Sequence, residues 1–312
     1  MIHVENLIFE YPTKRALFDI NLSIAKGGIT ALVGPNGAGK TTLINCLVGL
    51  HEPFAGHVLF DDMTVADEPR EAHKKMGYLP DFYGLYDDLT VRQCLAHGAE
   101  MRGMGRNESL ARAEISAARL NVADRLDDKV SSLSRGLTQR AAIARAIIHD
   151  PEFLVLDEPA AGLDPDARAQ LSALFRQLRD DGMTLLVSSH ILAELEDYCT
   201  DMIIIRDGRV VDQGMAAGTA PKRRISIELA EPCPRLETVL LAEPNVSHVD
   251  MDGLRVTVHL NGGKIEQLTL LKRLVDDGIP VIGFSDIKER LQDTYQRAVT
   301  EKAGNETNGD GA

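Results

Sequence analysis

Gly34-Pro35-Asn36-Gly37-Ala38-Gly39-Lys40-Thr41-Thr42 is the stretch of sequence that decides the fold. It follows a short apolar strand expected at 29–33 and precedes a segment of helical character at 41–50. Glycines without a Cβ let such a loop fold closely around phosphate, and successive backbone N–H groups and the helix start hold its negative charge. Strand, glycine-rich loop and helix in this order predict a P-loop and not an ordinary glycine turn.

Two side chains in this loop carry the chemistry of a phosphate site. Lys40 is placed to reach the β- and γ-phosphates of a nucleotide. Thr41 is placed to put its hydroxyl on Mg²⁺. The loop therefore predicts a nucleotide together with its metal ion.

Three further motifs follow the P-loop, and they are Leu133-Ser134-Arg135-Gly136-Leu137-Thr138-Gln139-Arg140, then Phe153-Leu154-Val155-Leu156-Asp157-Glu158, then Ser188-Ser189-His190. The apolar run 153–156 predicts a buried strand that delivers Asp157 and Glu158 at its carboxyl end. Neighbours on a strand point to opposite sides, so the two carboxylates can do different jobs. Ser134 fits the N-cap of a helix expected over 138–148, and a capped helix start is also an anion site.

Together the four motifs resemble the nucleotide-binding subunit of ATP-binding cassette (ABC) transporters, over roughly residues 1–220. The resemblance implies an α/β P-loop NTPase of ABC-ATPase type, with a β subdomain, a parallel-sheet core and a helical subdomain, and with ATP and Mg²⁺ as cofactors. It gives Asp157 the role of holding Mg²⁺ through water and Glu158 that of the general base that polarises the attacking water. Thr42 is expected at an α-phosphate oxygen.

The segment that begins at Ser134 occupies the place of the family signature, Leu-Ser-Gly-Gly-Gln followed by x-Gln-Arg. Five positions match, namely Leu133, Ser134, Gly136, Gln139 and Arg140. Arg135 replaces a Gly and Leu137 replaces the Gln. In the family this segment faces the γ-phosphate bound by the partner protomer. Arg135 either hinders the close backbone approach to that phosphate or adds a cation beside it, and both alternatives stay open.

Three more positions take expected roles from the resemblance. His190 follows a strand expected at 184–187 and resembles the switch histidine that contacts the γ-phosphate. Tyr11 resembles the aromatic residue that stacks on adenine. Asp164, in Ala161-Gly162-Leu163-Asp164, resembles the D-loop that meets the partner across the dimer. Asp164 followed by Pro165 also fits a plain helix N-cap with proline at the first helical position.

The clearest departure from the family is Asp81 in Gly77-Tyr78-Leu79-Pro80-Asp81, where the family generally has Gln. That Gln touches Mg²⁺, and the loop behind it relays to the membrane subunit. A carboxylate can still ligate Mg²⁺ through oxygen, although Asp is one methylene shorter and charged. The segment 81–90 looks like the exporter branch of the family, which pairs with six-helix permeases.

The composition of the chain limits the classes of partner that it can be expected to bind. The chain has 312 residues, a formal charge of −13 and no basic run, which disfavours binding to duplex nucleic acid. No stretch of about 18 apolar residues is present, so a membrane span is not expected. The four cysteines lie far apart and show neither metal spacing nor a disulfide framework, which fits a reducing compartment.

A second, smaller domain is expected after the ABC ATPase domain of residues 1–220. Pro221 and the basic cluster Lys222-Arg223-Arg224 mark the boundary, and residues 221–300 predict a small α+β accessory domain. Its strands are expected at 225–229, 246–249, 254–260 and 281–284, and its helices at 264–276 and 286–299. Residues 301–312 are rich in Gly, Asn and Asp and are expected to be disordered. In the first domain, Thr90 and Asn107 are predicted as helix caps.

The interpretation is an ATP-binding and hydrolysing subunit that dimerises with a second copy on ATP and powers a separate integral-membrane permease, with export favoured by the resemblance. We expect a cytoplasmic protein held peripherally on the inner face of the cell membrane through that permease. The alternative is a soluble ABC ATPase that acts on ribosomes, DNA ends or protein assemblies, although such proteins commonly carry two cassettes, a coiled-coil insertion or basic arms. A small-molecule P-loop kinase would explain Lys40 but neither the signature nor His190.

Overall fold

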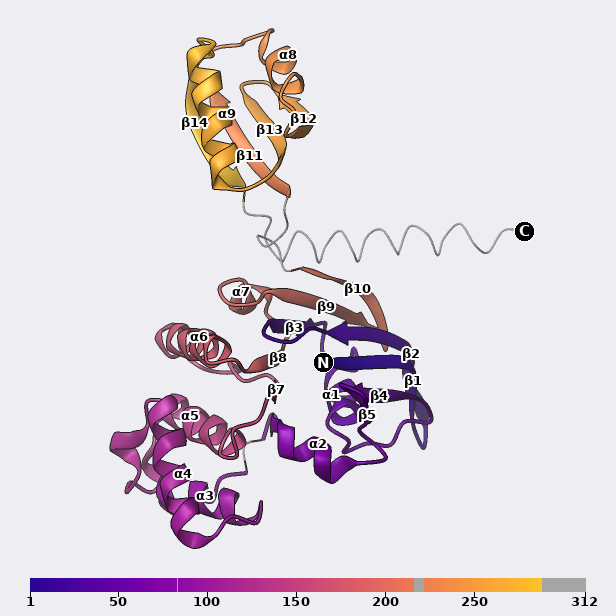
Figure 1. Ribbon diagram of the computed structural model, residues 1–312, viewed down its shortest axis with the longest axis vertical. Helices are drawn as coiled ribbons and strands as arrows, with labels where there is room; N and C mark the ends of the chain where they lie inside the picture. The colour runs from indigo at the N-terminus through magenta and orange to yellow at the C-terminus, as the bar shows by residue number, and fades with distance from the viewer. Residues whose placement is uncertain (83, 216–221, 288–312) are drawn as a thin grey trace, which may run out of the picture. The chain divides into compact units, whose positions relative to one another are not determined.

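The computed structural model describes residues 1–82, 84–215 and 222–287. The chain divides between Gly214 and Met215 into two compact units, and each has its own hydrophobic core. Both units are drawn in Figure 1. Within the described ranges, every helix is too short or too polar to cross a membrane.

A six-stranded sheet in the order β10-β9-β3-β8-β7-β6 forms the centre of the first unit. Its strands are β3 (Ile29–Val33), β6 (Met76–Leu79), β7 (Phe153–Leu156), β8 (Thr184–Ser189), β9 (Asp201–Arg206) and β10 (Arg209–Met215). The strands from β9 to β6 pair in parallel, and every residue of β3, β7 and β8 is buried. Such continuous apolar runs suit a parallel sheet with both faces covered. The predicted parallel-sheet core is confirmed.

A second sheet of the first unit is antiparallel and has the order β2-β1-β4-β5. Its strands are β1 (Ile2–Tyr11), β2 (Lys14–Ile24), β4 (Ala55–Phe60) and β5 (Met63–Thr64). Leu7 of β1, Leu43 of helix α1 (Lys40–Leu47) and Phe153 of β7 belong to one hydrophobic cluster. The two sheets therefore share a core with α1, which fixes the start of α1 against both.

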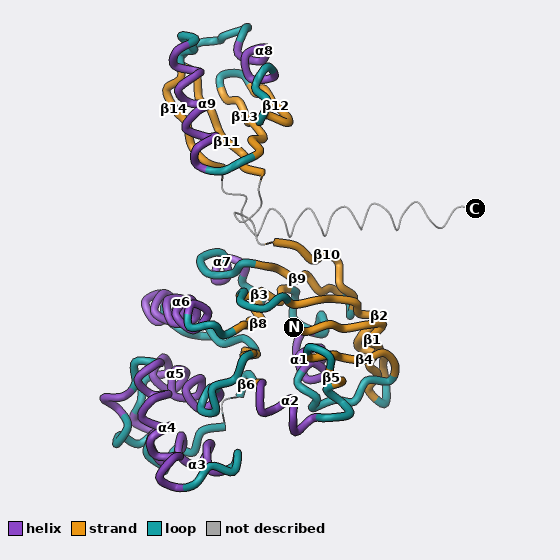
Figure 2. Tube along the Cα trace, viewed as in Figure 1, coloured by secondary structure: helices purple, strands orange, loops and turns teal. Residues whose placement is uncertain are grey.

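The first unit has six further α-helices among its described residues, and three of them form a compact group. The six are α2 (Pro69–Lys75), α3 (Val91–Glu100), α4 (Arg106–Arg119), α5 (Arg135–Ala146), α6 (Pro165–Asp180) and α7 (Leu192–Leu195), with short 3₁₀ turns at Ala123–Arg125 and Val130–Ser132. Helices α3, α4 and α5 contact one another and gather away from the orange strands in Figure 2.

Helix ends test three of the predicted caps. Thr90 caps α3 as predicted, in a capping box in which its hydroxyl accepts from Gln93 N and the Gln93 side chain accepts from Thr90 N. The prediction for Asn107 is wrong. Helix α4 begins at Arg106, because extended Gly105 is its N-cap and its carbonyl accepts from Ser109 N at 2.8 Å. Ser134 is confirmed as a cap, but its helix begins at Arg135 and not at 138, directly after the cap.

The carboxyl ends of four parallel strands meet at one edge of the six-stranded sheet. Strand β3 leads into the P-loop, β7 into Asp157 and Glu158, β8 into His190, and β6 into Asp81. Ligands of open α/β sheets bind at this edge. The parallel register therefore brings together four segments that lie far apart in the sequence.

The second unit is a four-stranded antiparallel sheet of order β12-β13-β11-β14 with two helices. The elements are β11 (Lys222–Leu229), α8 (Leu236–Leu241), β12 (Val246–Asp252), β13 (Arg255–Asn261), α9 (Lys264–Asp276) and β14 (Val281–Ile287). This βαββαβ order is the ferredoxin-like arrangement. Alternate residues of β11 and β13 face a core that includes Leu240 of α8 and Leu270 of α9.

In the second unit one predicted helix start needs correction and one helix was missed. Helix α8 was not anticipated, and Asp286 and Ile287 continue β14 because they still pair with Ile225 and Arg224 of β11. The start of the helix expected over 286–299 is therefore wrong. The rest of that helix, the boundary at Pro221 and the tail 301–312 lie outside the described residues.

Candidate functional site

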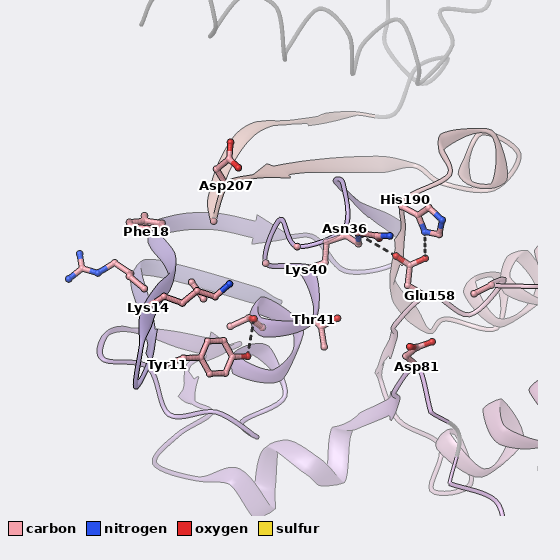
Figure 3. A pocket seen from close by; sticks show the side chains of 17 residues that line it. Tyr11, Lys14, Phe18, Asn36, Lys40, Thr41, Asp81, Glu158, His190 and Asp207 are labelled. Carbon is pink, nitrogen blue, oxygen red and sulfur yellow. Dashed lines mark hydrogen bonds and ion pairs between the residues drawn. The ribbon is translucent and has the colours of Figure 1, made fainter. Parts of the chain in front are cut away.

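A cavity of about 590 Å³ opens at the carboxyl edge of the six-stranded sheet (Figure 3). Its lining includes predicted residues from the P-loop, from the end of β1 and from the segments after β6, β7 and β8. Those residues are Tyr11, Asn36, Gly37, Gly39, Lys40, Thr41, Thr42, Asp81, Glu158 and His190. The fold thus gathers most of the sequence-predicted site residues around one space.

The P-loop takes a shape that requires glycine at its last turn. Gly39 has φ +105°, and a Cβ there would lie 3.0 Å from the Leu17 side chain. It precedes α1, and its carbonyl accepts from Leu43 N at 2.8 Å. Pro35 and Ala38 close the loop through a bond from Ala38 N to Pro35 O at 3.1 Å. A left-handed glycine directly before a helix leaves the first N–H groups of that helix pointing into the loop.

Glu158 lies between a lysine and a histidine. Its Oε1 is 3.3 Å from Nζ of Lys40, and its Oε2 is 2.7 Å from Nδ1 of His190. The same Lys40 ammonium donates to Gly34 O at 2.8 Å and is almost fully buried. Figure 3 shows the two contacts to Glu158 as dashed lines. This arrangement orients the Glu158 carboxylate from both sides.

Asp157 is the most buried carboxylate of the site, with 1% of its surface exposed. Its Oδ2 accepts from the Thr41 hydroxyl at 2.8 Å, and its Oδ1 accepts from the Ser188 hydroxyl at 2.6 Å. The Ser188 oxygen in turn accepts from Glu158 N at 2.8 Å. Glu158 has φ +49°, a strained value for a non-glycine residue. Ser188 therefore ties both acidic residues to β8.

Tyr11 and Asp81 stand at other parts of the cavity wall. The Tyr11 hydroxyl is 3.2 Å from Oγ1 of Thr42, and its ring meets Phe9 edge to face at 5.0 Å. Asp81 is exposed on the lining. Burial, and then the charges of Asp157 and Asp81, raise the pKa of Tyr78 to about 12.

The signature-like residues lie elsewhere. The described residues that line the cavity do not include Ser134, Arg135, Gly136 or Asp164. The Ser134 hydroxyl caps α5 by accepting from Leu137 N at 3.4 Å, and Asp164 caps α6 by accepting from Ala167 N at 2.9 Å. The Arg135 guanidinium rests on Gly162, where an added Cβ would overlap it. Within one chain, α5 therefore does not reach the phosphate loop of its own cavity.

Several lining residues were not anticipated. They are Lys14, Arg15, Ala16, Phe18, Ala161, Asp207 and Gly208. The guanidinium of Arg209 lies over the ring of Phe18, with its Cζ 4.9 Å from the ring centroid. The hydrogen bond from Phe18 N to Gly208 O, at 2.8 Å, joins the β2 segment to the turn between β9 and β10. Pairing of segments this distant leaves no local pattern in the sequence.

Sequence comparison places the chain in a known family. Residues 17–161 match the family described as ABC transporter. The ABC transporter ATP-binding protein NatA of Bacillus subtilis is 35% identical over 201 residues, which cover 64% of this chain and 82% of NatA. The linearmycin resistance ATP-binding protein LnrL of the same organism is 30% identical over 273 residues, which cover 86% of this chain and 84% of LnrL.

Solved structures agree with this assignment. The cbiO1 protein of Clostridium perfringens, part of the ABC transporter complex cbiONQ, has 29% identity and a TM-score of 0.64 over 69% of this chain and 88% of cbiO1. An ATP-binding cassette solved as a dimer in a post-hydrolysis state with ADP and Pi has 25% identity and a TM-score of 0.63 over 69% of this chain and 98% of that one. The chain belongs to the ATP-binding proteins of ABC transporters, and it is an ATPase.

Proposed function

We propose that this protein is the ATP-binding and hydrolysing subunit of an exporter, which dimerises on ATP and drives a separate integral-membrane permease. The observation that carries the hydrolytic part is the Glu158 carboxylate, held between Lys40 and His190 at the carboxyl edge of the sheet. In this proposal Glu158 is the general base that accepts a proton from the attacking water. Lys40 binds the β- and γ-phosphates, and His190 orients Glu158 and contacts the γ-phosphate.

The donor set fits Mg²⁺ bound together with a nucleotide. Thr41 and Asp81 line the cavity with a hydroxyl and a carboxylate, and the buried Asp157 carboxylate accepts a hydrogen bond from the Thr41 hydroxyl. Mg²⁺ prefers such hard oxygens, and it usually takes only one or two carboxylates plus phosphate and water. When bound, Mg²⁺ would neutralise charge on the phosphates.

Adenine binding is assigned to Tyr11 and the neighbouring wall. The partly exposed Tyr11 ring lies at the rim and is fixed through its hydroxyl to Thr42. Gly34 to Thr42 would wrap the phosphates with backbone N–H groups, including those of Asn36 and Gly37. The ring would thus stack on the base while the loop holds the other end of the nucleotide.

We assign the signature-like residues to a second copy of the chain. Ser134, Arg135 and Gly136 open helix α5 but do not line the cavity of their own chain. A helix start of this kind attracts phosphate. A partner protomer would present it, with its Asp164 loop, to the γ-phosphate bound by this chain. A relative in the same family has been solved as a dimer with ADP and Pi.

The direction of transport is supported by the names of relatives, and the permease by cbiO1, which is part of the ABC transporter complex cbiONQ. LnrL is named for linearmycin resistance, and the Burkholderia relatives that are 34–35% identical are named Nod factor export ATP-binding proteins. The described chain offers no helix that could itself cross a membrane. We therefore place the protein peripherally on the inner membrane face, with residues 1–220 as the ATPase domain and 221–300 as an accessory domain.

The test is Glu158→Gln, which keeps the size of the side chain and removes its basicity. We expect loss of turnover with retained ATP binding, and a stable ATP-bound dimer in size-exclusion chromatography. Membranes of the source cell should retain the wild-type protein together with a six-helix permease. Turnover of Glu158→Gln at the wild-type rate would remove Glu158 from its role, and co-purification with ribosomes or DNA would replace the permease assignment.

A further inference from the structure

Helix α9 of the second unit turns an apolar stripe away from its own core. Ile265, Leu268 and Val275 are 77%, 52% and 61% exposed, whereas Leu270 and Leu274 on the other side of the helix are buried. With Lys272, the exposed residues follow a 3-4-3 spacing. This spacing places them in one row, the pattern of a helix that packs against a second helix.

The first and last residues of α9 carry charges that oppose its dipole, whereas Glu266 in the first turn and Arg273 in the last turn follow it. Lys264 is the first helical residue and Asp276 the last. A helix is stabilised by acidic residues at its start and basic residues at its end, so both positions cost stability in an isolated α9. Other charges nearby have partners: Arg273 contacts Glu243 at 2.8 Å, and Glu266 caps Gly263 N. The placement of Lys264 and Asp276 calls for a reason outside the helix.

We infer that α9 is a contact surface for α9 of a second copy of this chain, packed antiparallel about a two-fold axis that crosses the exposed face between Leu268 and Lys272. In this pairing Ile265 lies opposite Val275 of the other copy, and Leu268 lies opposite the stem of Lys272. The Lys264 end of each helix meets the Asp276 end of the other. The surface is therefore self-complementary in charge and shape, which a two-fold contact requires.

The small size of the surface decides how it would be used. Three apolar side chains on a 13-residue helix bury far less than the roughly 1,200 Å² of a stable interface. The contact would be weak alone and effective where the two copies are already tethered. Its use in the transporter rests on the proposed ATP-dependent dimer, while the contact itself needs no nucleotide.

The experiment is disulfide trapping in the full chain without nucleotide, in a Cys233→Ser background. The three cysteines that remain are buried. One chain carries Ile265→Cys, and a second, larger tagged chain carries Val275→Cys. Antiparallel pairing predicts that the mixed product forms faster than either self-product, because two copies of position 265 would stand about 15 Å apart along the helix. The control is Ile282→Cys in β14, which is 70% exposed and lies outside the hydrophobic core of this unit.

Exchange of the charges at positions 264 and 276 tests the antiparallel pairing more specifically. Lys264→Asp or Asp276→Lys alone should slow trapping about twofold to thirtyfold, the range that two exposed ion pairs span. The double exchange should restore it. Each single change follows the preference of the helix dipole, so slower trapping with unchanged or raised thermal stability separates a contact from misfolding.

Three results would overturn the inference. One is mixed trapping no faster than with Ile282→Cys, and another is a double exchange that fails to rescue. The third is an Ile265→Cys variant whose new thiol a maleimide reaches only after residues 288–300 are deleted, since the chain itself would then cover α9. Loss of the ATP-dependent dimer with trapping intact would instead count against the proposed function alone.

Discussion

Ser188→Ala should weaken the first unit and its catalysis together. The Ser188 hydroxyl donates to Oδ1 of buried Asp157 at 2.6 Å and accepts from the backbone of Glu158 at 2.8 Å. Alanine removes both bonds and adds no steric conflict. The perturbation therefore isolates the tie between the two acidic residues and strand β8.

The expected cost follows from the two bonds. A hydrogen bond to a charged group contributes about 1.5–3 kcal/mol and a neutral one about 0.5–1.5 kcal/mol. Because Asp157 is 1% exposed, water cannot readily replace the lost donor. We expect a loss of about 2–4 kcal/mol in the free energy of unfolding. For a unit of this size, that lowers the melting temperature by roughly 4–16 °C.

Urea unfolding followed by far-ultraviolet circular dichroism measures this loss, since the chain has no tryptophan. Turnover should fall about tenfold or more, because a misplaced base costs at least about 1.4 kcal/mol in the transition state. The control is Ser172→Ala, whose hydroxyl only bonds back to Arg168 O within α6. It should stay within about 0.5 kcal/mol of wild type. An unchanged unfolding midpoint and rate for Ser188→Ala would refute the reasoning.

Three other expectations concern single positions. Asp81→Asn should raise the Mg²⁺ concentration needed for half-maximal turnover, because a hard-cation site loses a negative charge, and superimposable titrations would place Asp81 outside the metal site. Gly162→Ala should destabilise the first unit by about 1–2 kcal/mol, through its φ of +68° and its overlap with Arg135, and Arg135→Ala should recover only part of this loss in urea unfolding. Burial, and then Arg102, lowers the pKa of His149 to about 4 from 6.5, so the unfolded chain takes up the proton first. The contribution of His149 to the free energy of unfolding is full above about pH 6.5 and is lost as the pH falls toward 4. His149→Gln should therefore flatten the dependence of the unfolding free energy on pH in this range.

The centre of the fold could be predicted because its signals are local. The strand at Ile29–Val33 has the predicted bounds, and α9 spans Lys264–Asp276 as expected. An apolar run between a turn and a glycine-rich loop leaves few alternatives for a strand. The parallel arrangement then follows from alternating strands and helices, and it brings Glu158 and His190 together without any further signal.

The rest depends on contacts between distant segments. The strand β14 extends beyond its apolar residues because β11 still pairs with Asp286. The polar sequence there favours a helix when it is considered without that pairing. Ser188 lies in a quoted motif, but only the packing of β7 beside β8 reveals that it bridges Asp157 and Glu158. Lys14 and Phe18 enter the cavity wall through the folding of the antiparallel sheet. Local secondary-structure propensity does not predict contacts between residues that lie far apart in the sequence.

The most direct test of the account is whether two chains share one ATP site. Lys40→Ala disables the phosphate loop, and Ser134→Arg disables the helix start that we assign to the partner's site. Each variant alone should be inactive. Mixed heterodimers contain one composite site with neither change, so the account predicts that ATPase activity reappears on mixing. No recovery, with heterodimers shown to form, would contradict it.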